Sequence, residues 1–167
     1  MKNISNIHTN YSCSEAMKMV LELFSERPNT ISLNEKLKLY GTNLNELKPE
    51  SIDVILIYVL SILEDSILTA DEMATLKDLK RYLRIKEGDF LKYHKEDIIQ
   101  EIIYIQMQHI LEDLKVDKTE ALFKTDLQQL FDLSYDQFLQ FERKAIEEAL
   151  NKGADIKDLD TISILPR

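Results

Sequence analysis

The chain has 167 residues, of which 44% are hydrophobic and 31% are charged, with three glycines and three prolines. These proportions are typical of a helix-rich globular protein and exclude a disordered chain. The formal net charge of -9 disfavours nucleic acid and anionic membrane surfaces as partners, because both repel an acidic protein. A basic protein or a cation is the better candidate.

The sequence also bears on the cellular location. Cys13 is the only cysteine, so no internal disulfide bond can form, which favours a reducing cytoplasm. The first residues are polar and lack the apolar core of a signal peptide. The most apolar run, residues 52–63, contains Asp53 and is shorter than the roughly 20 residues that span a bilayer. We therefore expect a cytoplasmic protein without a transmembrane segment.

Residues 1–13 are rich in Asn, Ser and Thr and are expected to form a flexible arm. After them, apolar residues recur at the three- and four-residue spacing of helices. In chain order, the predicted helices cover about residues 14–26, 32–40, 50–64, 70–85, 95–114, 118–131 and 134–153. No stretch of useful length shows the alternation of a strand. The chain is thus predicted to be all-α, with a single domain of about six to eight helices over residues 14–167.

Several helix ends carry side-chain signals. Four segments have the form of a capping box, in which a Ser, Thr or Asp side chain and the side chain three positions later each bond the other residue's backbone N–H. These segments are residues 32–35, 69–72, 117–120 and 134–137. Gly41, Gly88 and Gly153 are expected to end helices, because glycine readily adopts the left-handed backbone that often follows a helix.

The sequence contains an internal repeat. Residues 62–90 align with residues 110–138 at a shift of 48 positions without a gap. The identical positions are Ile62, Leu63, Glu64, Asp65, Glu72, Asp78, Leu79 and Phe90. Self-similarity at a fixed period indicates a repeated structural unit. We therefore predict a tandem helix-turn-helix pseudo-repeat over about residues 51–90 and 99–138.

Each copy of the repeat places carboxylates at the turn between its two helices. Since the chain leaves along one helix and returns along the next, we expect both turns at the same pole. The metal-ligand candidates are Asp65, Glu72, Asp113 and Glu120, with Glu64 and Glu112 as outer candidates. Oxygen ligands of this kind suit Ca²⁺ or Mg²⁺. The alternative is structural, because Glu72 and Glu120 also hold the third position of a capping box, where a cap stabilises by about 1 kcal/mol.

The sequence gives little support for enzymatic chemistry. Cys13 and His8 are neighbours, but both fall in the predicted flexible arm, which cannot hold a catalytic geometry. The three glycines are isolated, so no phosphate-binding loop is indicated. We therefore expect neither a catalytic residue nor an organic cofactor.

The two turns resemble the signature of the TerB-like family, which is named for a tellurite-resistance protein. In that signature an apolar helix ends in an acidic residue, followed by Asp-Gly-x-apolar-Ser/Thr and an acidic residue that opens the next helix. Residues 65–72 resemble one copy and residues 113–120 a second, within a resemblance that covers about residues 52–150. This chain departs from the signature where Ser66 and Leu114 replace the glycine.

The resemblance implies an all-helical bacterial protein without enzymatic chemistry, in systems linked to tellurite and stress resistance. It also implies an acidic surface that binds a divalent cation, for which Ca²⁺, Mg²⁺ and Zn²⁺ are the candidates here. A second hypothesis belongs to a different class. The chain would be an acidic interaction module, of the immunity or adaptor type, that binds a basic partner and uses its net charge of -9 for electrostatic steering.

Overall fold

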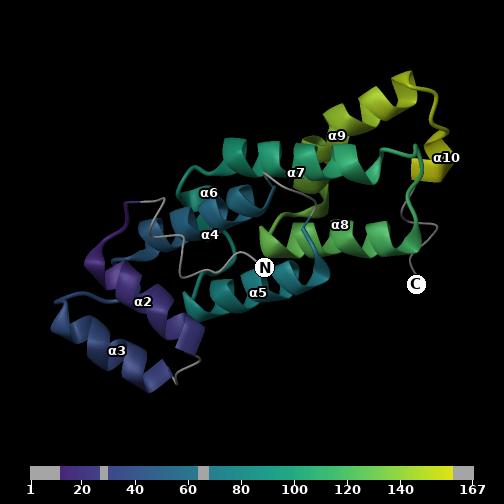
Figure 1. The fold of residues 1–167 in the computed structure, drawn as a ribbon. Coiled ribbons are helices and arrows are strands. Elements are labelled where there is room, and N and C mark those ends of the chain that lie inside the picture. Colours follow the sequence, from purple (N-terminus) through teal and green to yellow (C-terminus); the bar gives the residue numbers. More distant parts are fainter. Residues whose placement is uncertain (1–11, 27–29, 64–67, 160–167) are drawn as a thin grey trace. The chain divides into compact units, whose positions relative to one another are not determined.

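The computed structural model describes residues 12–26, 30–63 and 68–159, and all regular structure in these ranges is helical (Figure 1). The predicted all-α class is therefore confirmed. Within the described ranges the chain forms nine helices, two of which have four residues each and account for the excess over the six to eight expected. The chain divides into two compact units, residues 1–89 (unit 1) and residues 90–167 (unit 2).

The described residues of unit 1 form four helices of ten residues or more. They are α2 (Glu15–Glu26), α3 (Thr30–Leu39), α4 (Lys48–Leu63) and α5 (Ala70–Tyr82). Helix α2 packs against α3, and α4 packs against α5 in the opposite direction (Figure 1). The residues of α4 from Val54 to Leu56 are consecutive and all buried, so more than one face of this helix is covered. That matches the central position expected for a helix that is apolar on nearly every side.

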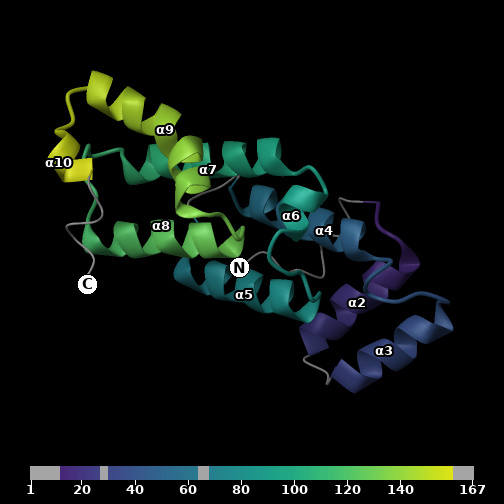
Figure 2. The ribbon, with the colours of Figure 1, turned by 180° about the vertical axis from the view of Figure 1, so that it is seen from behind.

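Unit 2 is built on three long helices. After α6 (Asp89–Lys92) come α7 (Glu96–Ile110), α8 (Lys118–Leu130), α9 (Tyr135–Asn151) and α10 (Ile156–Leu159). Helix α9 packs most extensively on α7, and Figure 2 shows these helices from behind. The rings of Phe90 and Phe131 meet edge to face, with 5.6 Å between their centroids. The Val116 N–H donates to the Asp158 carbonyl at 2.9 Å, which attaches the C-terminal segment to the start of α8.

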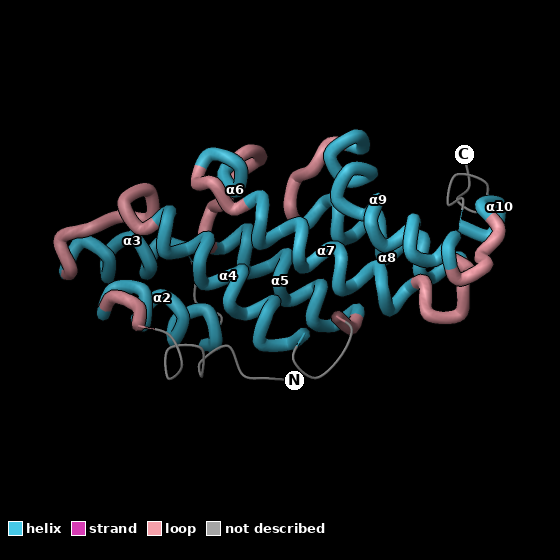
Figure 3. Tube along the Cα trace, turned by 90° about the horizontal axis from the view of Figure 1, so that it is seen from above, coloured by secondary structure: helices cyan, strands magenta, loops and turns pink. Residues whose placement is uncertain are grey.

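The 48-residue shift also relates the helix boundaries. Helix α4 begins at Lys48 and α7 at Glu96, while α5 covers 70–82 and α8 covers 118–130. Both α5 and α8 begin at a capping box, and both are followed by a residue with positive φ, Arg84 at 52° and Asp132 at 54°. The repeat is therefore present in backbone structure as well as in sequence. The tube in Figure 3 shows the helices and the loops that join them.

The 48-residue correspondence between the two copies continues into a third helix of each copy. The Lys86 N–H donates to Asp89 Oδ2 at 2.8 Å, and at the equivalent place the Ser134 N–H donates to Gln137 Oε1 at 2.9 Å. In the first copy this helix, α6, ends after four residues, and His94 then turns the chain with a φ of 57°. In the second copy the helix continues for 17 residues as α9. The two copies thus differ mainly in the length of their third helix.

Several predicted helix ends were wrong. The helix predicted to run to residue 85 ends at Tyr82, because Arg84 turns the chain four residues before Gly88. The helix predicted to reach residue 114 ends at Ile110, and Leu114 takes a φ of 64°. Helix α3 begins at Thr30, so Ser32 lies inside the helix and not at the N-cap position predicted for it. The other three predicted capping boxes are confirmed.

Candidate functional site

The first acidic turn lies partly outside the described residues, which include neither Glu64 nor Asp65. Glu72 is described and belongs to the capping box of α5. Its Oε2 accepts bonds from the Thr69 N–H at 2.9 Å and from the Thr69 hydroxyl at 2.8 Å, while the Glu72 N–H donates back to Thr69 Oγ1. The structural role weighed for Glu72 is therefore present.

The second acidic turn is described throughout, and its carboxylates bond to the backbone. Asp113 Oδ1 accepts from the Lys115 N–H at 3.0 Å, and Glu120 Oε2 accepts from the Asp117 N–H at 2.8 Å. The Glu120 N–H donates to Asp117 Oδ1 at 2.8 Å, which completes the box that opens α8. Between them, Leu114 adopts the left-handed backbone that the glycine of the TerB-like signature would adopt without strain.

The carboxylates of the second turn influence one another electrostatically. The pKa of Glu120 is raised, first by partial burial and then by the negative charges of Asp117 and Asp113, while the bond from the Asp117 N–H acts in the opposite direction. Glu112 is exposed beside them. Asp113, Asp117 and Glu120 therefore form one negative cluster at the start of α8.

The predicted metal ligands that the structure describes are divided between the two units. Glu72 belongs to unit 1, whereas Asp113 and Glu120 belong to unit 2, so their meeting at one pole stays a prediction. Among the described residues, no group of three His, Cys, Asp or Glu side chains is placed to hold a metal ion. Glu64 and Asp65 lie outside the described residues.

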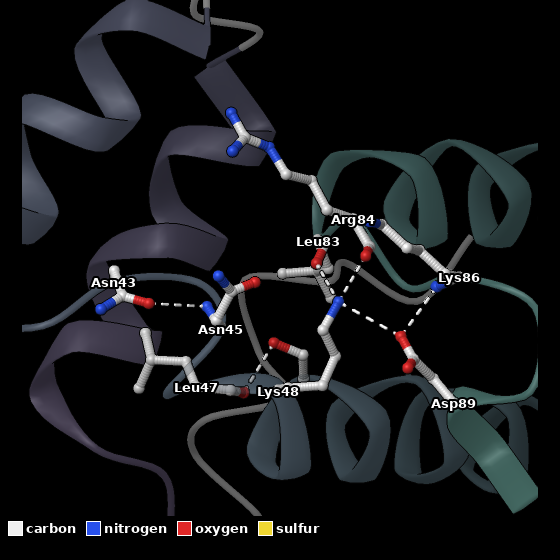
Figure 4. A network of polar contacts seen from close by, with 9 residues as sticks. Asn43, Asn45, Leu47, Lys48, Leu83, Arg84, Lys86 and Asp89 are labelled. Atoms are coloured by element: carbon white, nitrogen blue, oxygen red, sulfur yellow. Dashed lines mark hydrogen bonds and ion pairs between the residues drawn. The ribbon is translucent and has the colours of Figure 1, made fainter. Parts of the chain in front are cut away.

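A buried lysine organises the turn after α5 (Figure 4). Lys48 Nζ donates to the carbonyl oxygens of Leu83 and Arg84 and lies 3.3 Å from Asp89 Oδ2. The side chain is almost fully buried. The ammonium group thus holds the left-handed turn against the start of α4. Sequence analysis missed this role, because a lysine at the start of a helix gives no signal that its side chain turns inward.

A buried ion pair joins α8 to α9 in unit 2. Lys124 Nζ lies 2.7 Å from Glu142 Oε2, and the two side chains are 7% and 3% exposed. Burial raises the pKa of Glu142, and the neighbouring Lys124 ammonium lowers it by a smaller amount. The repeat contains a signal for this pair, because the 48-residue shift puts Lys124 at the place of the fully buried Leu76. A lysine at a core position requires a partner.

A second polar network joins α7 to α9 on the surface of unit 2. The Tyr104 hydroxyl donates to Glu148 Oε1 at 2.9 Å, and Gln108 Nε2 donates to both Tyr104 Oη and Glu148 Oε2. These bonds lower the pKa of Glu148, with the Tyr104 bond as the main cause. The Lys144 ammonium lies 4.4 Å from the centroid of the Tyr104 ring. The network fixes α9 at a second place along its length.

Helix α9 also carries apolar residues that it does not bury. Tyr135, Leu139 and Leu150 are 51%, 38% and 37% exposed, and Ile146 is partly exposed. At about 100° per residue these four lie within an arc of roughly 60°, which we call the outer face of α9. The buried Phe138, Phe141, Ala145 and Ala149 fill the adjoining arc. The outer face was not predicted from the sequence. The signal for it was that the apolar arc of α9 is wider than one packed face requires.

The negative charge is distributed unequally between the units. Residues 90–167 contain 16 Asp and Glu against 10 Lys and Arg, a net charge of -6. Residues 1–89 contain 14 Asp and Glu against 11 Lys and Arg, a net charge of -3. Two of the basic residues of unit 2 are engaged within it, since Lys124 pairs with Glu142 and Arg143 with Glu147. Unit 2 therefore has more net negative charge per residue than unit 1.

Comparisons with protein-family models, with curated proteins and with solved structures give no match for this chain. The resemblance to the TerB-like family therefore stays a prediction. Across the described ranges, no helix reaches the length and apolarity that a bilayer span requires.

Proposed function

We propose that the chain is a non-enzymatic interaction module that binds a basic protein through the acidic surface of unit 2. The observation that carries the proposal is the net charge of -6 on residues 90–167, next to exposed apolar side chains on α9. Complementary charge speeds the encounter with a basic partner and selects against acidic ones. Apolar contacts then supply binding energy that charge alone does not.

The rigidity of unit 2 supports this function. Helix α9 is held to α8 by the Lys124–Glu142 pair and to α7 by the Tyr104–Glu148 bond. A surface that is already ordered loses less conformational entropy when it binds. The described carboxylates of the second turn are engaged in backbone bonds, which is a structural role and requires no ligand.

The test is binding of a fluorescent 16-residue lysine-rich peptide to the full chain, with a glutamate-rich peptide of equal length as control. We expect only the lysine-rich peptide to bind, with an affinity that falls as NaCl is raised, because exposed charges are screened within about 8 Å at 0.15 M salt. Equal binding of both peptides, or none of the lysine-rich one at low salt, would contradict the proposal.

Paired glutamate variants locate the binding surface. Glu101→Gln/Glu112→Gln removes two exposed negative charges from unit 2, and Glu35→Gln/Glu87→Gln removes two from unit 1. The first double variant should weaken binding of the lysine-rich peptide more than the second, because its two charges belong to unit 2. Equal weakening would show that total charge alone determines binding.

A second candidate function is divalent-cation binding at the acidic turns, as in a TerB-like resistance protein. Burial is the main cause of the raised pKa of Glu120, and the charges of Asp117 and Asp113 raise it further. That repulsion favours this candidate, because a bound cation would relieve it. The test is thermal unfolding in chelator against millimolar Ca²⁺, Mg²⁺, Zn²⁺ and Mn²⁺. Binding to the folded state should stabilise by about 2.7 kcal/mol at a hundred times the dissociation constant. The Asp65→Asn/Asp113→Asn variant should lose that gain, and no shift with any cation removes this candidate.

A further inference from the structure

We propose that the outer face of α9 binds an amphipathic helix of a partner, with lysine and arginine beside the apolar residues of that helix. The inference rests on the proposed function and specifies both the surface and the kind of partner. An extended basic tail is a different kind of partner, because it would need negative charge on this protein but no ordered row of apolar side chains.

The geometry of the outer face matches a helix. Tyr135, Leu139, Ile146 and Leu150 follow one another at spacings of four, seven and four residues along one side of α9. The fifteen helical steps from Tyr135 to Leu150 cover about 22 Å. A partner helix of about four turns can lay its own apolar row along that length, which is a common mode of peptide recognition.

The exposure of these side chains indicates a surface and not isolated protrusions. Each of Tyr135, Leu139 and Leu150 is roughly one third to one half exposed, so each rests partly on its neighbours. The adjoining arc of α9 is buried within unit 2. An apolar row at the edge of a packed face is the kind of feature that marks an interaction site.

The charge around the outer face determines the choice of occupant. Residues 132–158 contain seven Asp and Glu against four Lys and Arg. The nearest basic side chain on the open edge, Arg143, is paired with Glu147 at 2.8 Å. Complementarity therefore favours lysine and arginine on the partner helix. A second copy of this chain is disfavoured as occupant, because each copy has a net charge of -9.

The experiment uses two peptides of identical composition. One places four leucines along one helical side with lysines on both edges, and the other has the same residues in scrambled order. Dissociation constants are measured by fluorescence anisotropy with the full chain and with Leu139→Gln/Leu150→Gln. Leu39→Gln is the control, because Leu39 is 85% exposed on α3 in unit 1. Circular dichroism establishes that each variant is folded.

We expect the ordered peptide to bind the unchanged protein at least about tenfold more tightly than the scrambled peptide. The Leu139→Gln/Leu150→Gln variant should lose this difference and Leu39→Gln should keep it. If both peptides bind equally well and the double variant has no effect, the proposed acidic module stands but its α9 surface does not. If neither lysine-rich peptide binds at low salt, both proposals fail.

Two further outcomes would assign the outer face to another occupant and overturn the inference. A concentration-dependent dimer that Leu139→Gln/Leu150→Gln converts to monomer, measured by sedimentation equilibrium, would assign it to a second copy. A chain that ends at Leu159 and binds the ordered peptide about tenfold more tightly than the full chain would assign it to residues 160–167.

Discussion

Replacing Lys124 with methionine tests whether the buried ion pair holds unit 2 together. The change removes the ammonium group but keeps most of the aliphatic volume, and it leaves the Glu142 carboxylate buried without its partner. At 2.7 Å the Coulomb attraction is about 6 kcal/mol for an effective dielectric constant near 20, which is an upper limit because both charges were also desolvated. Removal of one partner from a buried pair typically destabilises by about 3–5 kcal/mol.

The destabilisation by Lys124→Met should depend on pH. Burial already raises the pKa of Glu142 above its ordinary value of 4.5, and loss of the ammonium removes the effect that opposes this rise. A carboxyl group with a raised folded-state pKa contributes stability that is fully present below 4.5 and is lost as the pH rises through the folded value. The variant should therefore lose about 3–5 kcal/mol at pH 8 and clearly less as the pH is lowered, because protonation removes the charge of Glu142.

The assay is urea unfolding followed by circular dichroism at several pH values. Arg143→Met is the matched control, because Arg143 and Glu147 lie 2.8 Å apart on the same helix but are 77% and 57% exposed. It should change the free energy of unfolding by less than about 1 kcal/mol at any pH. The double variant Lys124→Met/Glu142→Gln should lose the pH dependence. Equal effects of Lys124→Met and Arg143→Met would refute the argument from burial.

Three further substitutions test the helix ends. Ser134→Ala should lower the free energy of unfolding by about 1 kcal/mol through loss of the α9 cap, and an unchanged urea midpoint would contradict the bond from the Gln137 N–H. Lys48→Met should destabilise by about 2–4 kcal/mol, because two carbonyl groups and Asp89 lose the ammonium, while exposed Lys86→Met should be nearly neutral in the same assay. Arg84→Gly should stabilise by roughly 0.5–1 kcal/mol in thermal unfolding, because glycine relieves a φ of 52° at an exposed position, and Arg84→Ala should give no such gain.

The features that the sequence predicted correctly depend on local chemistry. The Thr69, Asp117 and Ser134 caps were found because a short side chain bonds a backbone N–H only two or three residues away. The 48-residue repeat was also found from the sequence alone, because identical residues recur at one constant shift along the chain. The Ser32 cap failed because the same four-residue pattern also occurs inside helices, where neighbouring turns already satisfy the backbone.

The features that the sequence did not predict depend on tertiary structure. The stop after α5 uses Arg84, whereas Gly88 was expected to end that helix, and the stop after α8 uses Asp132, for which no left-handed residue was predicted. The inward turn of Lys48 and the outer face of α9 became visible only when the packed faces were known. Of the predicted ligands, Glu72 and Glu120 are accounted for as caps, and the metal site stays a prediction.

The two buried lysines give each unit its own chemical reporter. Lys48 lies in unit 1 and Lys124 in unit 2, and both amines are shielded from water in the folded chain. An amine-reactive reagent therefore reaches them only when the surrounding unit opens, while exposed lysines react at once. Mass spectrometry of labelled peptides at increasing urea would give a separate opening free energy for each half of the molecule, without a mutation or an attached dye.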